Sequence, residues 1–458
     1  MTSRRKPEGT VARTRRAIGL MQALVLFESA LYSAITPILP HYAHALGASK
    51  TAIGVLTAAY SGGLVPGSLL GGWLAARAGV RRTTLAGLLL FAIAVGIFGL
   101  PGQIAPLDAL RFVQGVGSGL IWGGALTWVV VSTARERRGA ALGGVIGAAV
   151  FGTLVGPALG AAATAAGPLP VFAALGGCSL VLAAIVSGQE DPSRRRGGGG
   201  AGDSEPERLP RTGALVGTLV LGIWLTGLEA LTIGVVDTLL PLQLARLGAS
   251  GVAIGAIFLL TAGIRTVLSP LIGRLCDRRG PSLPVFAGLL VGAPLLAVIP
   301  RAGSLVLVAL LALLFLGGPL SAYMIPAATL ITNAVERAGG APAFATMLFN
   351  LAWGVGQTVG APAAGALGQA AGDAVPYIAT AALMVATLPL ARRALRARPT
   401  SAVTPADGVA RDEAGEPGVS GTDASASARE RVDGAREGVG DANARAAAVR
   451  SARVRCPQ

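Results

Sequence analysis

The stretch GGWLAARAGVRRTT, residues 71–84, ends a long apolar run with two glycines and then places three arginines within six residues. A second stretch, IGRLCDRRGPS at residues 272–282, repeats the pattern. Three residues of the first copy have counterparts 201 positions later: Gly72 corresponds to Gly273, Arg77 to Arg278 and Gly79 to Gly280. The first glycine of each pair is expected to allow close approach of another backbone, and the last a tight turn into the next helix.

The composition indicates the class of protein in which these turns lie. The chain has 458 residues, of which 52% are hydrophobic and only 13% charged, and its mean hydropathy is +0.64. An ordinary soluble domain has roughly 25% charged residues. A soluble protein of this length could not bury so much apolar sequence, so we expect an all-α integral membrane protein with many spans.

Apolar runs of about 20 residues, the length that crosses a bilayer, divide the chain into two sets of six. The first set lies near residues 18–40, 51–74, 83–101, 105–131, 140–165 and 168–187, and the second near 213–243, 252–273, 283–300, 303–330, 343–368 and 373–391. The Gly-, Pro- and charge-rich segment between the sets is a flexible linker by composition, and the tail has too few large apolar residues to fold. The expected parts are a cytoplasmic N-terminal segment (1–17), an N-terminal six-helix half (18–187), a cytoplasmic linker (188–212), a C-terminal six-helix half (213–392) and a disordered cytoplasmic tail (393–458).

The basic residues predict the orientation, because cytoplasmic loops are enriched in Lys and Arg. One side of the membrane receives the N-terminus, the linker and the following arginines: Arg77, Arg81, Arg82, Arg135, Arg137, Arg138, Arg274, Arg278, Arg279, Arg337, Arg392, Arg393, Arg396 and Arg398. The other side receives Lys50, Arg246 and Arg301. We therefore expect a multi-pass plasma-membrane protein with both termini in the cytoplasm.

The offset of 201 residues extends well beyond the two basic turns. Glu28 falls on Glu229, Pro40 falls on Pro241, and the tetrapeptide LGAS at 46–49 recurs at 247–250. Composition alone would hardly align a rare intramembrane glutamate with a proline and a tetrapeptide without a gap. We therefore expect two homologous six-helix halves, an architecture in which substrate sites lie near mid-membrane between the repeats.

The net charge of +15 suggests nucleic acid at first, but the basic residues lie in short clusters between apolar runs, and no aromatic-interleaved basic stripe is present. Cys178, Cys276 and Cys456 are too far apart in the sequence to form a disulfide framework or a metal site. The chain has no phosphate-binding loop of the G-x-x-x-x-G-K-[ST] type, which disfavours ATP-driven transport. No nucleic-acid partner, metal or cofactor is expected.

The loop pattern G-x-x-x-D-R-x-G-x-R-R resembles the signature between the second and third helices of the major facilitator superfamily. Gly72, Arg77, Gly79, Arg81 and Arg82 match it, and in the second copy Gly273, Asp277, Arg278 and Gly280 match. In the first copy Ala76 replaces the family's Asp, whereas the second copy keeps the acid as Asp277. The resemblance implies loops that stabilise one of the alternating states; the alternative is a basic turn without a gating role.

Three further stretches are similar to twelve-helix drug:proton antiporters of that superfamily. The fifth-helix signature G-x8-G-x3-G-P-x2-G-G is matched by Gly143, Gly152, Gly156, Pro157 and Gly160, with Ala161 replacing the last glycine. Arg111 and Gln114 lie in the fourth-helix pattern L-x-x-R-x-x-Q-G-x-G, and Pro37 and Pro40 form the P-x-x-P of helix one. Glycines three or four apart make a groove for a neighbouring helix, although generic small-residue packing would also explain them.

The ionisable residues inside apolar runs are the candidates for proton coupling or substrate binding, because each costs about 2.5–3.5 kcal/mol at the centre of a span. They are Glu28, Arg111, Glu229, Asp237 and Arg265. Glu229 and Asp237 are eight residues apart, about 80° around a helix, so both can face one cavity. A buried carboxyl group favours its protonated form, and a nearby substrate cation would expel that proton, which is a physical basis for antiport.

Two structural alternatives remain for these residues. Glu229 or Asp237 could form a salt bridge with Arg265, and Arg111 could pair locally with Asp108 at a helix start. Trp224, Trp353, Asn350 and Gln357 could line the cavity or only pack between helices.

The sequence thus predicts a secondary transporter, not an enzyme, which is expected to work as a monomer in the bilayer and to exchange protons for small lipophilic or cationic compounds. A sugar or metabolite transporter of the same fold is the alternative, and a membrane-embedded enzyme or receptor is a more remote one. No cluster resembles a nucleophile–base pair, which argues against an enzyme.

Truncation after Arg398 is expected to leave transport unchanged, because the segment beyond has no apolar periodicity with which to dock. Uptake by the full-length and truncated proteins in the same vesicles checks this. Loss of transport by a correctly inserted truncated protein would show that the tail binds or regulates.

Overall fold

A computed structural model describes residues 8–100, 102–133, 137–192, 213–340 and 342–396. The predicted linker and tail, and the arginines expected in them, therefore fall largely outside the described residues. The described chain is helical throughout: α1 (Glu8–Ser33), η1 (Thr36–Ile38), α2 (Leu39–Ala45), α3 (Lys50–Ala78), α4 (Val80–Gly96), α5 (Ile104–Ser132), α6 (Arg138–Ala166), α7 (Pro168–Ser187), α8 (Gly213–Arg246), α9 (Gly251–Arg279), α10 (Ser282–Val298), η4 (Ile299–Arg301), α11 (Leu305–Gly317), α12 (Pro319–Arg337), α13 (Pro342–Ala370) and α14 (Ala374–Arg396).

The twelve predicted spans all correspond to helices. Ten of them are long and apolar enough to cross a membrane, among them the joined segments Thr14–Ala45 and Leu305–Arg337. The other two predicted spans correspond to α4, which has 17 residues, and to α13, which carries several polar side chains. Helix α1 begins at Glu8, ten residues before the apolar run, so the predicted span covers only the later part of this helix.

The internal repeat is present in the local structure as well as in the sequence. Helices α3 and α9 have 29 residues each and start at serine N-caps, Ser49 and Ser250. The side chain of each serine accepts a hydrogen bond from the backbone N–H three residues later. Such a cap satisfies one of the free N–H groups at a helix start. Both helices end at glycines with positive φ, 90° at Gly79 and 79° at Gly280, so the predicted tight turns are confirmed.

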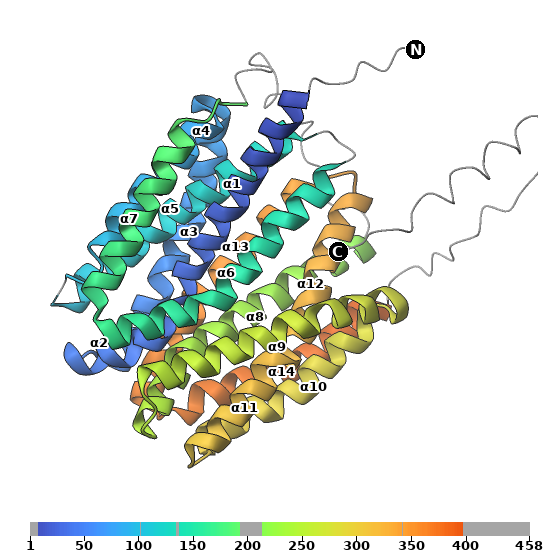
Figure 1. Cartoon of the computed structure of the whole chain (residues 1–458). Coiled ribbons are helices and arrows are strands. Elements are labelled where there is room, and N and C mark those ends of the chain that lie inside the picture. Colours follow the sequence, from blue (N-terminus) through green and yellow to red (C-terminus); the bar gives the residue numbers. More distant parts are fainter. Residues whose placement is uncertain (1–7, 101, 134–136, 193–212, 341, 397–458) are drawn as a thin grey trace, which may run out of the picture. The chain divides into compact units, whose positions relative to one another are not determined.

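The helices of each half pack mainly with one another. Figure 1 shows α1, α3, α4, α5 and α7 lying together in blue to green, and α9, α10, α11 and α14 lying together in yellow-green to orange. In the first half α1 packs on α6 and α4 on α7, and in the second half α8 packs on α13 and α10 on α14. Each half has its own buried apolar cluster, with Leu24, Phe91 and Trp128 in the first and Leu225, Phe315 and Tyr323 in the second.

Two helix pairs, α3 with α13 and α6 with α9, form the main contact between the halves. The contact is close because glycines face the other backbone: a Cβ placed on Gly54 would lie 2.3 Å from the Ala361 carbonyl oxygen, and one on Gly365 would lie 2.2 Å from that of Lys50. Both contacts lie where the N-terminal part of α3 meets the C-terminal part of α13. We call this side of the bundle the Asp373 end, after the residue that precedes α14, and the side with the Gly79 and Gly280 turns the arginine-rich end.

Three of the four glycines in the fifth-span motif pack closely against a neighbouring segment. Ideal Cβ atoms on Gly152, Gly156 and Gly160 of α6 would lie 2.1, 2.3 and 2.1 Å from the carbonyl oxygens of Leu26 and Ala30 of α1 and of Ala34, which directly follows α1. Pro157 lies inside the same helix. A Cβ placed on Gly143, at the start of the motif, would meet no atom of another segment within 4 Å.

One expectation from the basic turns is wrong. Gly72 and Gly273 have open space where a Cβ would stand, so neither admits a close backbone neighbour in this conformation. The reason is that the packed faces of α3 and α9 are rotated away from these two positions near the helix ends.

Replacing Gly156 by Ala is expected to destabilise the protein by about 1–3 kcal/mol, because the new methyl group cannot fit against α1. Gly143→Ala in the same helix is the matched control and should be neutral or stabilising by about 0.5–1 kcal/mol, since Ala is the better helix former. Thermal unfolding in detergent measures both. Equal midpoints for the two variants would show that α1 and α6 are not in close contact.

Candidate functional site

Glu28 of α1 lies at the centre of the first half with 3% of its surface exposed. Four side chains donate hydrogen bonds to its carboxylate: Tyr60 of α3, Ser118 and Trp122 of α5, and the neighbouring Ser29. The Ser118 and Trp122 bonds measure 2.5 and 2.9 Å. Among the described residues no cation lies within ion-pair distance of Glu28, so neutral donors alone hold this acid.

Arg111 of α5 lies close to this acid but makes other contacts. Its guanidinium donates to Gln114 Oε1 at 2.9 Å and to the Tyr32 carbonyl oxygen at 3.4 Å, and it lies 4.7 Å from the centre of the Tyr60 ring. Asp108, the alternative partner from the sequence, forms no ion pair with it, and one Asp108 carboxylate oxygen is buried without a partner. Arg111 therefore stacks on the same tyrosine that donates to Glu28.

The second half holds its acids differently. Glu229 of α8 is 1% exposed and forms an ion pair with Arg265 of α9, whose Nη2 lies 3.2 Å from Glu229 Oε1. The Arg265 Nε also donates to Ser321 Oγ at 3.2 Å. The salt bridge that the sequence left open is therefore present for Glu229. Asp237, two turns along α8, forms no hydrogen bond or ion pair within the described part of the chain.

Aromatic and amide groups join the two halves between these acids. The Tyr32 ring of α1 packs against Tyr60, with 5.1 Å between ring centres, and against Trp353 of α13, with 5.5 Å. Gln357 of α13 donates to the Tyr32 hydroxyl and accepts from the Ser61 hydroxyl of α3. The site therefore extends across the contact between the halves.

In the described part of the chain, Arg77 and Arg81 of the predicted gating loops make contacts within the first half. Arg81 donates to the carbonyl oxygens of Ser187 and Gln189, where its charge faces the C-terminus of α7. Arg77 lies over the Trp73 ring at 4.5 Å. Arg82, Arg278 and the second-half acid Asp277 are exposed.

A charged cluster that the sequence did not reveal lies at the Asp373 end. Asp373 accepts from Lys50 of the first half at 2.5 Å and from Arg246 of the second half. Burial alone would raise the pKa of Asp373, but the hydrogen bonds from Lys50 and Arg246 outweigh it and hold this pKa below its usual value. The cluster therefore stays ionised at neutral pH, and protonation would weaken it only below the ordinary range of an aspartate. Near it, Thr51 donates to Gln369 across the same contact.

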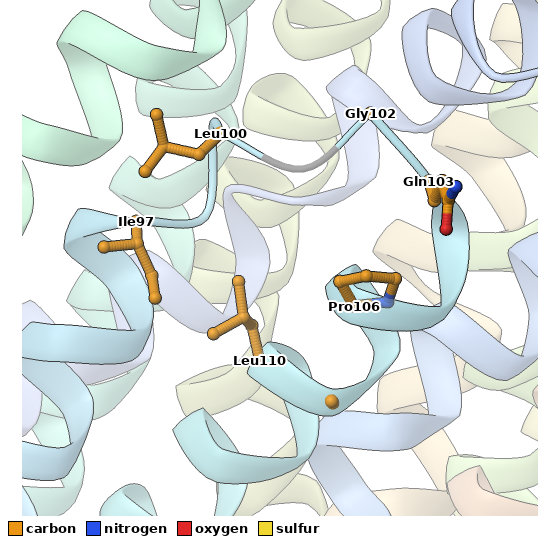
Figure 2. A pocket seen from close by; sticks show the side chains of 7 residues that line it. Ile97, Leu100, Gly102, Gln103, Pro106 and Leu110 are labelled. Carbon is orange, nitrogen blue, oxygen red and sulfur yellow. The ribbon is translucent and has the colours of Figure 1, made fainter.

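A pocket of about 660 Å³ lies between the end of α4 and the start of α5. Ile97, Leu100, Pro106 and Leu110 line it, and Gln103 supplies its one polar side chain (Figure 2). With no charged group in its lining, it offers nothing to hold a proton or an ionic substrate. Among the described residues no group of His, Cys, Asp and Glu could hold a metal ion.

The chain has two homologous six-helix halves, and each half buries one acid at the equivalent position, Glu28 or Glu229. This arrangement defines the class of protein: a membrane transporter built from repeats. The chain belongs to the Major Facilitator Superfamily, whose family model matches residues 23–356. It is thus a major facilitator transporter, a member of a family of transport proteins rather than of enzymes.

Known proteins support the assignment to this family. A "Chloramphenicol resistance protein" of Streptomyces lividans is 31% identical over 363 residues, covering 77% of this chain and 89% of that protein. "Multidrug resistance protein 2" of Bacillus subtilis (strain 168) is 28% identical over 127 residues, covering 28% of this chain and 32% of that protein.

Solved structures show the same fold at low identity. A bacterial homologue of the human lysosomal transporter Spinster, inward-facing and unoccupied, has a TM-score of 0.69 at 15% identity and covers 85% of this chain and 99% of its own. The inward-open xylose transporter XylE from E. coli has a TM-score of 0.63 at 13% identity and covers 84% of this chain and 96% of its own.

Arg265→Met is expected to destabilise the protein by about 3 kcal/mol, because it leaves the Glu229 charge buried without a partner. The double variant Glu229→Gln with Arg265→Met should recover most of that loss, since it leaves no uncompensated charge. Thermal unfolding of the two single variants and the double variant forms a mutant cycle. Additive losses would mean that the two residues do not interact.

Proposed function

We propose that the protein exports small lipophilic or cationic compounds in exchange for protons, with Glu28 as a proton-carrying group. The observation that carries this proposal is the Glu28 carboxyl group, which is buried in a membrane span among four neutral donors and forms no ion pair within the described residues. An intramembrane acid costs several kcal/mol, so a position that structure alone needed would favour an apolar side chain.

The hydrogen-bond set suits an acid that gains and loses a proton. An ionised carboxylate only accepts, and all four partners can donate to it. When the carboxyl group is protonated it must donate one bond, and the hydroxyl groups of Ser118 and Tyr60 can rotate to accept it. The indole N–H of Trp122 keeps donating in both states. The same set of side chains can therefore donate to the ionised carboxylate and accept from the protonated group.

The charge balance supports a cationic substrate. Arg265 compensates Glu229, which leaves Glu28 and Asp237 as the acids of the candidate set without a paired cation among the described residues. One of them can carry the proton while the other meets a cation, and a bound cation would favour release of the proton. The name of the Streptomyces lividans relative adds chloramphenicol, an uncharged aromatic compound, as a second kind of substrate to test.

The described conformation fits a transporter closed at the Asp373 end. Contacts across the halves run along α3 and α13 from Gly365 beside Lys50 to Gly354 beside Val65. Towards the arginine-rich end, Gly72, Gly143 and Gly273 lie on helices that contact the other half, but a Cβ added to any of them would meet no atom of another segment within 4 Å. In the alternate state, we infer, the Gly79 and Gly280 loops approach each other and the Asp373 end opens.

The orientation and location are inferred from charge. Because the arginine-rich end carries most of the basic loop residues, it would face the cytoplasm, and so would both termini of a plasma-membrane protein. A state open to the arginine-rich end would then be inward-facing, which is also the conformation of the Spinster homologue and of XylE in the similar solved structures.

Reconstitution tests the function as a whole. Proteoliposomes are given a pH gradient with an acidic lumen, so that protons leaving the lumen can drive substrate inwards. Radiolabelled chloramphenicol or ethidium, a lipophilic cation, is added outside. Gradient-dependent accumulation that collapses on adding a protonophore supports antiport. Equal accumulation with and without the gradient would overturn proton coupling.

Glu28→Gln is expected to reduce gradient-driven accumulation at least about tenfold, because the amide cannot carry the proton while it keeps the size of the side chain. Glu336→Gln, at an exposed acid near the end of α12, is the matched control and should keep the wild-type rate. Wild-type accumulation by correctly folded Glu28→Gln protein would remove Glu28 from the mechanism.

A further inference from the structure

Gln357 of α13 is a second-half residue whose whole polar group is used by the first half. Its side chain is 1% exposed, its Nε2 donates to the Tyr32 hydroxyl of α1, and its Oε1 accepts from the Ser61 hydroxyl of α3. A buried amide left without partners costs about 1–3 kcal/mol. Separation of α13 from the first half at this level would therefore expose or leave unpaired both ends of the amide at once.

The two partners of Gln357 are directly connected to the residues that hold Glu28. Tyr32 follows Glu28 by one turn of α1, and Ser61 is the chain neighbour of Tyr60, which donates to Glu28. The rings of Tyr32 and Tyr60 also pack against each other, 5.1 Å between centres. A rotation or shift of α3 that removes Tyr60 from the Glu28 carboxylate must move Ser61 relative to Gln357.

On the other side, Gln357 follows Trp353 by one turn of α13. The Trp353 ring packs edge-on against Tyr32, 5.5 Å between centres, so α13 contacts the first half through a ring and an amide on the same face. The ring contact is not directional and tolerates sliding, whereas the two hydrogen bonds do not. The amide is therefore the part of this contact that distinguishes one arrangement of the halves from another.

We propose that Gln357 is a positioning residue of the transport cycle: its amide clamps α13 to α1 and α3, and it releases Tyr32 and Ser61 when Tyr60 leaves Glu28. The proposal rests on the proposed role of Glu28 and adds the element through which that acid acts on the second half. The clamp holds the contact that runs from mid-membrane to the Asp373 end.

The test measures the opening of the Asp373 end directly and needs neither a substrate nor a proton gradient. Spin labels are placed at His44 and Ala371, exposed positions on opposite halves at that end, in full-length protein whose three native cysteines are replaced by alanine. Pulsed electron–electron double resonance in nanodiscs gives the distribution of distances between the two labels. The ratio of the long-distance population to the short-distance population then reports the opening of this end. Gln357→Met, which removes both hydrogen bonds and keeps the length, should raise that ratio about fivefold, the change that about 1 kcal/mol produces.

Three variants separate the amide from general packing. Gln357→Glu keeps an acceptor for Ser61 and for a donating Tyr32 hydroxyl, so it should restore the parent distribution. Thr358→Val is the matched control, since among the described residues the Thr358 hydroxyl donates to the Gly354 carbonyl oxygen of its own helix and to no other group. Gln357→Asn, too short to reach both partners, replaces the Met variant if that protein does not fold.

The link to Glu28 is tested in the same measurement. Glu28→Gln should raise the ratio in the same direction, and the double variant should go no further than the larger single change, because both act on one contact. A parent-like distribution in Gln357→Met, or an equal shift in Thr358→Val, would overturn the clamp. Additive effects of the Glu28 and Gln357 changes would overturn the coupling between these two residues. If gradient-driven transport fails while the label distances change as expected, the proposed function is wrong and the clamp stands.

Discussion

The structure depends on the burial of one carboxyl group, that of Glu28, in the middle of six helices. A charge there is costly unless hydrogen bonds replace the lost water. The donors come from α3 and α5, which must therefore stay within hydrogen-bond reach of α1. On its opposite side α1 lies directly on the glycines of α6. Close glycine packing on one face and polar contacts on the other thus fix α1 in the first half.

The internal repeat supplies two similar scaffolds that hold chemically different sites. Caps, turns and helix lengths correspond between α3 and α9, and Glu28 and Glu229 occupy equivalent positions in the sequence. Glu229 is compensated by Arg265, whereas Glu28 is held by neutral donors. This difference places an ion pair in the second half and leaves in the first half the acid that we propose carries the proton. Tyr32 and Gln357 connect the two environments across the contact between α1 and α13.

The fold was largely predictable from the sequence, because the features that decide it are local. Apolar runs, the LGAS caps and the glycine turns act within a few residues, and the offset of 201 residues identifies the halves. The site was only partly predictable. Its acids and arginines stand out in apolar runs, but the donors of Glu28 do not: Tyr60, Ser118 and Trp122 are common in helices, and only packing brings them together. The sequence suggested Asp108 as a local partner of Arg111, yet Arg111 donates instead to Gln114, one turn along α5, and to the Tyr32 carbonyl oxygen of α1. The cluster of Lys50, Arg246 and Asp373 joins residues more than 100 positions apart, beyond the reach of any local pattern.

The central claim is that Glu28 exchanges a proton as substrate binds, and proton release on binding tests it most directly. Purified protein in weakly buffered detergent solution, with a pH-sensitive dye, is mixed with ethidium or chloramphenicol while binding is followed separately. The account predicts that protons appear in the solution in proportion to the occupied sites, because bound substrate favours the ionised carboxylate. Saturable binding without proton release, at every pH at which the protein is stable, would contradict it.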